Sequence, residues 1–127
     1  MNGYTPLPPS LRRCAAAALI AAAIFAFWAA MQPSLALPGH ILDKLAHIGT
    51  FAVLGALAQA AAPDRRTLLL ALAGLAALGG LIEIVQYFLP DRESSVVDFL
   101  SDVVGITFGA WAARHIIGLW RERLFAR

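Results

Sequence analysis

The sequence predicts an all-α integral membrane protein, a bundle of four transmembrane helices with both termini in the cytoplasm. Of its 127 residues, 60% are hydrophobic and only 14% are charged, and the mean hydropathy is +0.72. These values do not describe an ordinary soluble domain of this length. Four apolar runs are present, and each has about 18 to 23 residues, close to the ~20 that a helix needs to cross the hydrocarbon core. They cover about residues 14–31, 43–62, 67–89 and 96–117.

The segments between the runs contain residues that end helices. The first break contains Pro33, Pro38 and Gly39, and the breaks at 63–66 and 90–95 each begin with a proline. Because the second and third breaks are short, helices two and three, and helices three and four, are expected to be antiparallel neighbours. The sequence therefore predicts a compact bundle.

The basic residues predict the orientation, because Lys and Arg resist translocation and accumulate on the cytoplasmic side. With the N-terminus inside, only Lys44 and Arg92 lie outside. The other eight of the ten basic residues are then cytoplasmic: Arg12, Arg13, Arg65, Arg66, Arg114, Arg121, Arg123 and Arg127. They lie between and beyond the apolar runs rather than on one amphipathic face, which argues against nucleic acid as a partner.

The ends of the chain suggest three parts. Residues 1–11 contain three prolines and no apolar periodicity, which predicts a disordered cytoplasmic tail. Residues 12–119 form the transmembrane domain, and 120–127 are expected to lie on the cytoplasmic headgroups. The first run could instead be a cleaved signal peptide, since Arg12 and Arg13 precede it and small residues follow it. Its length of about 18 residues exceeds the usual 7 to 15 and favours an uncleaved helix.

Ionisable residues interrupt the apolar runs near their outer ends. Counting ~1.5 Å per residue from the nearest outer loop places His47, Glu83 and Asp102 at a similar depth, roughly 6 to 10 Å into the membrane. Spacings of three or four residues also put the polar side chains of each helix on one face. The sets are Asp43 with His47, Glu83 with Gln86 and Tyr87, and Asp98 with Asp102.

Small residues continue these polar faces, with Gly80 on the third helix and Gly105 and Gly109 on the fourth. Since small residues allow helices to approach closely, the polar faces are expected to point into the bundle. Intramembrane Asp, Glu and His are functional candidates by default, because a carboxylate facing lipid costs several kcal/mol. The candidate ligand-binding residues are Asp43, Lys44, His47, Glu83, Gln86, Arg92, Asp98 and Asp102, and the candidates for catalysis are His47, Glu83 and Asp102.

Structural roles are the alternative. Asp43, Lys44, Arg92 and Asp98 could be helix-end charges or caps, and His47, Glu83, Gln86 and Asp102 a hydrogen-bonded knot that holds the bundle together. The sequence contains no G-x-S-x-G, P-loop or H-E-x-x-H motif and no cysteine-based metal spacing. One histidine with three carboxylates could hold a hard divalent metal, but this composition is weakly specific, so metal and cofactor stay open.

An ordered combination of residues resembles the VanZ-like family over about residues 43–109. It consists of Asp43-Lys44, His47, Phe51, Leu54-Gly55, Gly80, Glu83, Gln86, Pro90, Arg92, Ser95, Asp98 and Gly105. The resemblance implies a multi-pass protein of the bacterial cytoplasmic membrane, related to a protein associated with low-level resistance to the glycopeptide antibiotic teicoplanin. It implies no agreed biochemical activity. This chain has Asp102 where members of the family commonly have Asn, which makes the site more acidic.

The leading hypothesis is an envelope protein whose outward-facing polar cavity binds an amphiphilic or lipid-linked ligand, such as a glycopeptide tail or a cell-wall precursor headgroup. The alternative is a membrane-embedded hydrolase or transferase, with His47 as base, Glu83 or Asp102 as acid or metal ligand, and Arg92 or Lys44 holding a phosphate. A bundle with no catalytic role is also open. An ion-coupled carrier is disfavoured, because the inner halves of helices three and four are almost wholly apolar. The lipid bilayer is the expected partner, and helices of this size often assemble into oligomers.

Overall fold

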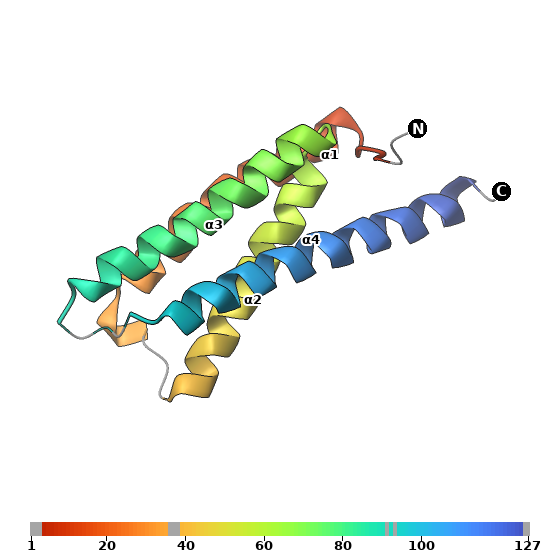
Figure 1. The fold of residues 1–127 in the computed structure, drawn as a ribbon. Helices are drawn as coiled ribbons and strands as arrows, with labels where there is room; N and C mark the ends of the chain where they lie inside the picture. Colours follow the sequence, from red (N-terminus) through yellow and green to blue (C-terminus); the bar gives the residue numbers. More distant parts are fainter. Residues whose placement is uncertain (1–3, 36–38, 91, 93, 126–127) are drawn as a thin grey trace.

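The computed structural model describes residues 4–35, 39–90, 92 and 94–125, and four long α-helices account for most of them. Each helix is long and apolar enough to cross a membrane, and no strand occurs in the described ranges. The predicted all-α membrane bundle of four helices is therefore confirmed. The helices are α1 (Pro9–Ala30), α2 (His40–Ala61), α3 (Arg65–Tyr87) and α4 (Val96–Phe125), and a short 3₁₀ turn, η1 (Pro33–Leu35), follows α1 (Figure 1).

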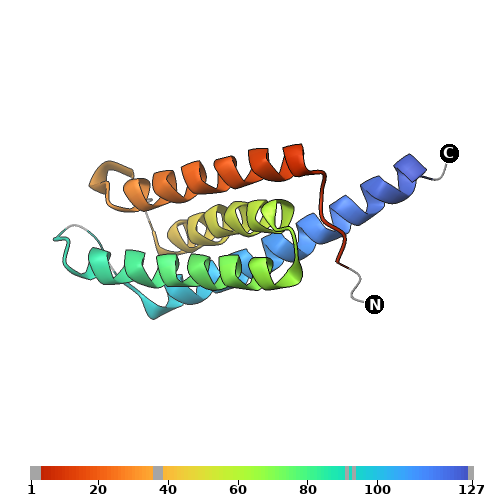
Figure 2. The same ribbon diagram turned by 90° about the horizontal axis from the view of Figure 1, so that it is seen from above.

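Helix α2 lies at the centre of the bundle and contacts each of the other three helices. Figure 2 shows it between α1 and α3, with α4 passing across the same group of helices. The pairs that follow each other in sequence do pack together, but the most extensive contact joins α2 to α4, which are not consecutive. Both termini lie at the same end of the molecule (Figure 1).

Three glycines bring the backbones of α2 and α4 into direct contact. A Cβ atom on Gly55 would overlap the backbone of Ile106, one on Gly105 the backbone of Ile48, and one on Gly109 the backbone of Ala52. The close approach predicted for Gly105 and Gly109 is therefore confirmed. Gly80 has room for a Cβ, 3.7 Å from the Phe99 ring, whereas a Cβ on its neighbour Gly79 would lie 2.6 Å from Asp102 Oδ2.

The first and last helices, α1 and α4, extend beyond the predicted spans. Helix α1 begins at Pro9, where proline suits the first turn because its missing N–H would have no helical partner. Helix α4 continues through Gly118 to Phe125. Residues 4–8, before α1, pack against the ends of α2 and α4, since the Tyr4 hydroxyl donates to Ala62 O at 3.0 Å and Arg121 donates to Pro6 O.

Asp64 caps the N-terminus of α3. Its Oδ1 accepts from the backbone N–H of Thr67 at 2.8 Å and its Oδ2 accepts from the Thr67 hydroxyl at 3.0 Å, and these bonds lower the pKa of the carboxyl. The stability that the cap contributes is therefore present above the ordinary aspartate pKa of about 3.9 and is lost as the pH falls through the lowered folded value.

We expect Asp64→Ala to expose the first turn of α3 at neutral pH, whereas Asp64→Asn keeps a cap that does not titrate. Amide hydrogen exchange of Thr67, expressed as a protection factor, measures this. The protection factor should fall in acid for the native chain, stay unchanged for Asp64→Asn, and be low at every pH for Asp64→Ala. Equal protection in the native chain and in Asp64→Ala at neutral pH would show that the cap contributes nothing.

Candidate functional site

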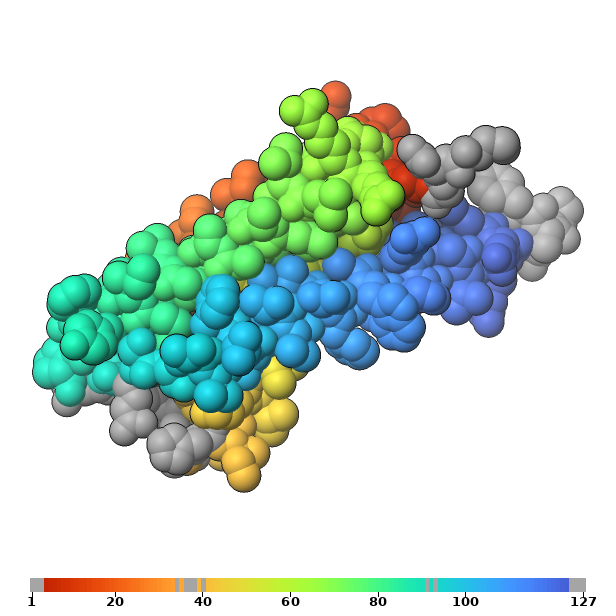
Figure 3. All heavy atoms as spheres, viewed as in Figure 1, coloured from red at the N-terminus to blue at the C-terminus, as the bar shows by residue number. Residues whose placement is uncertain are grey.

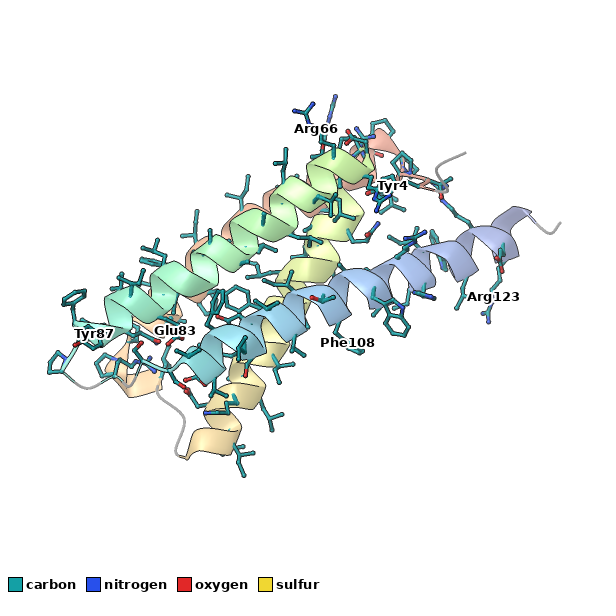
Figure 4. All side chains as sticks on the ribbon, viewed as in Figure 1. Tyr4, Arg66, Glu83, Tyr87, Phe108 and Arg123 are labelled. Carbon is teal, nitrogen blue, oxygen red and sulfur yellow. The ribbon has the colours of Figure 1, made fainter. Side chains whose placement is uncertain are left out.

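The polar side chains of α2, α3 and α4 gather at the end of the bundle opposite the termini. Figure 4 shows Glu83 and Tyr87 at this end, while Arg66 and Arg123 lie toward the end that carries the N- and C-termini. Within the polar cluster, one ring nitrogen of His47 and one carboxylate oxygen each of Glu83 and Asp102 all lie within 4.8 Å of one another. The structure thus brings together the three residues for which the sequence predicts a common depth.

Asp102 is the most deeply buried of these residues, with no exposed surface. Its Oδ1 accepts a hydrogen bond from the Nδ1–H of His47 at 2.8 Å, and the His47 side chain is itself only 13% exposed. Its Oδ2 lies in the space that the missing side chain of Gly79 leaves on α3. Asp102 therefore joins α4 to α2 and lies directly against α3.

Glu83 links α3 to the start of α4. Its Oε2 accepts from the backbone N–H of Ser95 at 2.7 Å, immediately before α4 begins, and the residue is 7% exposed. Its other oxygen, Oε1, has no hydrogen-bond partner among the described residues, and the same is true of Asp102 Oδ2. A third buried carboxylate oxygen, Asp98 Oδ1, also lacks a hydrogen bond but lies 3.3 Å from Lys44 Nζ, so only the oxygens of Glu83 and Asp102 lack both a hydrogen bond and a cationic partner among the described residues.

Lys44 and Asp98 form a second link between α2 and α4. Lys44 Nζ lies 3.3 Å from Asp98 Oδ1, and Asp98 is 3% exposed. Since the ion pair is partly buried and joins two helices, these residues are more than isolated charges at helix ends. Asp43, one residue before Lys44, is half-buried and can approach His47 and Asp98 within the same 4.8 Å limit.

Gln86 and Arg92 bind the C-terminal end of α1. The Gln86 amide donates to Ala30 O at 3.0 Å, and the Arg92 guanidinium donates to Ala29 O at 3.2 Å and also to Gln32 O. The last carbonyls of a helix have no partner within the helix. Gln86 supplies one to Ala30 O, and Arg92 adds a second donor to Ala29 O, which also accepts from the backbone N–H of Gln32 at 3.0 Å. Their structural contact with α1 could not be predicted, because backbone carbonyls leave no signal in a sequence.

A cavity of about 430 Å³ lies between α1, α2 and α3. Four of the eight predicted ligand-binding residues line it, namely Asp43, His47, Gln86 and Arg92, and the other four, Lys44, Glu83, Asp98 and Asp102, are not part of its wall. The remaining wall is almost entirely apolar and includes Ala22, Phe25 and Ala26 of α1, Phe51, Val53 and Leu54 of α2, and Ile82 of α3. Sequence analysis missed the α1 part of the wall, since that helix contains no polar residue facing the cavity.

The cavity opens between α1 and α2. The most exposed of its large hydrophobic wall residues are Phe25 on α1, at 63%, and Val53 on α2, at 57%, while the wall formed by α3 is buried. In the view of Figure 3, the side chains of α3 and α4 cover the front of the molecule and α1 lies behind them. The opening therefore lies on an apolar flank of the bundle, and His47 connects the cavity to the buried carboxylates behind it.

Comparison with known proteins gives one match. The sequence model of the VanZ/LLP1 family matches residues 10–120. No curated protein and no solved structure shows significant similarity to the chain. The matched range includes α1, which the resemblance seen in the sequence did not cover, and it reaches far into α4. The chain therefore belongs to the VanZ/LLP1 family and is a VanZ-like multi-pass membrane protein.

Proposed function

We propose that this VanZ-like protein binds an amphiphilic or lipid-linked ligand in the cavity between α1, α2 and α3. The observation that carries the proposal is the division of the cavity wall. Asp43, His47, Gln86 and Arg92 form its polar end, and the remainder is apolar and open on the flank of the bundle. A volume of about 430 Å³ lies within the range of about 300 to 1,000 Å³ that is typical of small-molecule sites.

The polar end of the cavity offers both donors and acceptors. Arg92 carries a cationic guanidinium whose Nε has no acceptor among the described residues, His47 adds an imidazole to the wall, and Asp43 supplies a carboxylate. This combination suits a headgroup with an anionic oxygen and hydroxyl or amino groups. An acylated glycopeptide and a lipid-linked cell-wall precursor share this chemistry.

The distribution of charge supports a place in the bacterial cytoplasmic membrane with both termini inside. Seven basic residues of the described ranges lie in the N-terminal parts of α1 and α3 or in the C-terminal half of α4, which is the cytoplasmic side by the positive-inside rule, namely Arg12, Arg13, Arg65, Arg66, Arg114, Arg121 and Arg123. The polar end of the cavity then faces the outer leaflet, where cell-wall precursors and antibiotics are accessible. Assembly into an oligomer would leave this proposal unchanged if the opening between α1 and α2 stayed free.

Tryptophan at Val53 tests the proposal, with Val104→Trp as the matched control. Both valines are 57% exposed, but only Val53 lines the cavity. The purified protein is titrated with three probes, namely teicoplanin, teicoplanin without its acyl chain, and undecaprenyl pyrophosphate. We expect Val53→Trp to weaken binding of at least one of the two lipid-bearing probes about tenfold or more, which is about 1.4 kcal/mol, because the indole fills the opening.

The control should bind like the native chain, and deacylated teicoplanin should bind at least about tenfold more weakly than teicoplanin if the apolar wall holds the acyl chain. Binding of undecaprenyl pyrophosphate alone would assign the cavity to a cell-wall precursor, and binding of teicoplanin alone would assign it to the antibiotic. Equal binding by Val53→Trp and Val104→Trp, or no binding of either probe by the native chain, would contradict the proposal.

A hydrolase or transferase is the second candidate, and the hydrogen bond from His47 to Asp102 favours it. A carboxylate that holds Nδ1–H fixes the tautomer of the imidazole and leaves Nε2 free to act as a base, on a residue that lines the cavity. Incubation of the protein with undecaprenyl pyrophosphate, followed by measurement of released phosphate, separates the two functions. Release by the native chain that is lost in His47→Ala would identify an enzyme, and binding without release would leave the protein a receptor.

A further inference from the structure

We propose that His47, Glu83 and Asp102 hold a divalent metal ion behind the ligand cavity. The three side chains come from three different helices, α2, α3 and α4. Their ligand atoms all lie within 4.8 Å of one another, so small movements of the side chains would bring each within bonding distance of one ion. Only His47 also lines the cavity, so the metal site goes beyond the proposed ligand site.

Two unpartnered oxygens point to a ligand in this cluster. Asp102 has no exposed surface and Glu83 is 7% exposed, yet Asp102 Oδ2 and Glu83 Oε1 have no hydrogen-bond partner among the described residues. An unsatisfied buried oxygen is costly, and more so on a carboxylate in a membrane-spanning bundle. A cation bound by both oxygens would satisfy them together.

The balance of charge in the polar cluster supports a doubly charged cation. Among the described residues, its carboxylates are Asp43, Glu83, Asp98 and Asp102, and its cationic side chains are Lys44 and Arg92, which leaves an excess of two negative charges in that set when His47 is neutral. Lys44 pairs with Asp98, and Arg92 binds the carbonyls at the end of α1. No lysine or arginine therefore pairs with Glu83 or Asp102 in the described part of the chain.

The donor atoms favour zinc or manganese. Imidazole suits zinc and iron, while carboxylates suit manganese, magnesium and calcium, so a mixed set of one imidazole and two carboxylates fits a first-row divalent ion. If the ion binds His47 through Nδ1, the proton that this nitrogen donates to Asp102 Oδ1 is released when the metal binds.

A second set, Asp43, His47 and Asp98, meets the same distance limit. Here Asp98 already pairs with Lys44 at 3.3 Å and Asp43 is partly exposed, so this set has less need of a cation. Both sets contain His47, so they differ only in their carboxylates, and those of Glu83 and Asp102 have the greater need of a cation.

Metal content and affinity test the proposal. The full chain is purified in mild detergent, stripped with a chelator, dialysed, and titrated with Zn²⁺, Mn²⁺ and Ca²⁺ by calorimetry, with metal content measured by mass spectrometry. We expect one Zn²⁺ or Mn²⁺ per chain, weaker binding of Ca²⁺, and a rise in melting temperature with metal concentration.

Asp102→Asn and Glu83→Gln should each lower the affinity for the metal about 100-fold or more. Loss of a residue that only supports a metal ligand costs up to about 100-fold, and loss of a ligand itself should cost at least as much. Asp64→Asn is the control, because it removes a carboxylate outside the polar cluster and keeps the cap of α3, and it should bind the metal like the native chain; Asp98→Asn tests the second set of candidate ligands. Circular dichroism and the elution volume confirm that each variant is folded. Absence of stoichiometric Zn²⁺ or Mn²⁺ in the native chain would overturn the proposal, and so would loss of binding in Asp98→Asn with retention in Asp102→Asn. Because these measurements contain no lipid probe, their outcome is independent of the ligand titrations.

Discussion

Alanine at Gly109 is expected to prevent stable packing of α4 on α2. The added Cβ would overlap the carbonyl oxygen, carbonyl carbon and Cα of Ala52, which are backbone atoms that cannot rotate away as a side chain could. Overpacking of a core commonly costs about 1 to 3 kcal/mol, and we expect about 3 kcal/mol or more here, because α2 and α4 form the most extensive contact of the bundle.

Gly118→Ala is the matched control, since Gly118 lies on the same helix and has no atom within 4 Å of the position of its Cβ. Alanine is a better helix former than glycine by about 1 kcal/mol, so this variant should be as stable as the native chain or slightly more stable. Thermal unfolding in detergent, followed by circular dichroism, compares the two. If Gly109→Ala melts at the same temperature as Gly118→Ala, the direct backbone contact between α2 and α4 does not stabilise the bundle.

The sequence predicted the helices well and their partners less well. Apolar runs of the right length, separated by prolines and charges, are a strong signal for membrane-spanning helices, and all four are present. The prediction, from the short connections, that consecutive helices are neighbours is correct. The connections could not show that α2 packs so closely on α4. That contact depends on Gly55 of α2 and on Gly105 and Gly109 of α4, which are far apart in the sequence and each face the backbone of the other helix.

The helix ends show the limits of hydropathy. Hydropathy ends a span at the charged residues, but Arg12, Arg13, Arg121 and Arg123 lie within α1 and α4 because arginine is a good helix former. A helix can continue past the apolar run into the headgroup region, where its arginines are solvated. The predicted boundaries at residues 14 and 117 therefore fall inside the observed helices.

Helical spacing predicted the polar cluster only in part. Depth counting placed His47, Glu83 and Asp102 in one layer, and their side chains do meet. The prediction that Glu83, Gln86 and Tyr87 share one helix face included one residue too many. Gln86 and Tyr87 are consecutive, so their side chains point about 100° apart around the helix. Gln86 is 4% exposed and reaches α1, whereas Tyr87 is 75% exposed and lies outside the cluster.

Asp102→Ala is expected to lower the free energy of unfolding by about 3 kcal/mol, whereas Asp102→Asn changes it by less than about 1 kcal/mol. Alanine removes the acceptor of the His47 Nδ1–H, and an unsatisfied buried donor costs about 1 to 3 kcal/mol, to which the void left by the carboxyl group adds. Asparagine has nearly the same shape and keeps a carbonyl oxygen that accepts the same hydrogen bond.

The unfolding of both variants is measured by denaturant titration in the presence of a chelator, so that bound metal does not contribute. His47→Leu and the double variant His47→Leu/Asp102→Ala complete a thermodynamic cycle, which should give a coupling of about 1 to 3 kcal/mol. If the changes in the free energy of unfolding of the two single variants add up to that of the double variant, the hydrogen bond between His47 and Asp102 contributes nothing to stability, whatever ion the cluster binds. Because Asp102→Asn keeps the hydrogen bond to His47 but removes a negative charge, it separates the two roles of this carboxylate. A stable Asp102→Asn protein that has lost its metal would show that the hydrogen bond holds the helices together and the charge holds the ion.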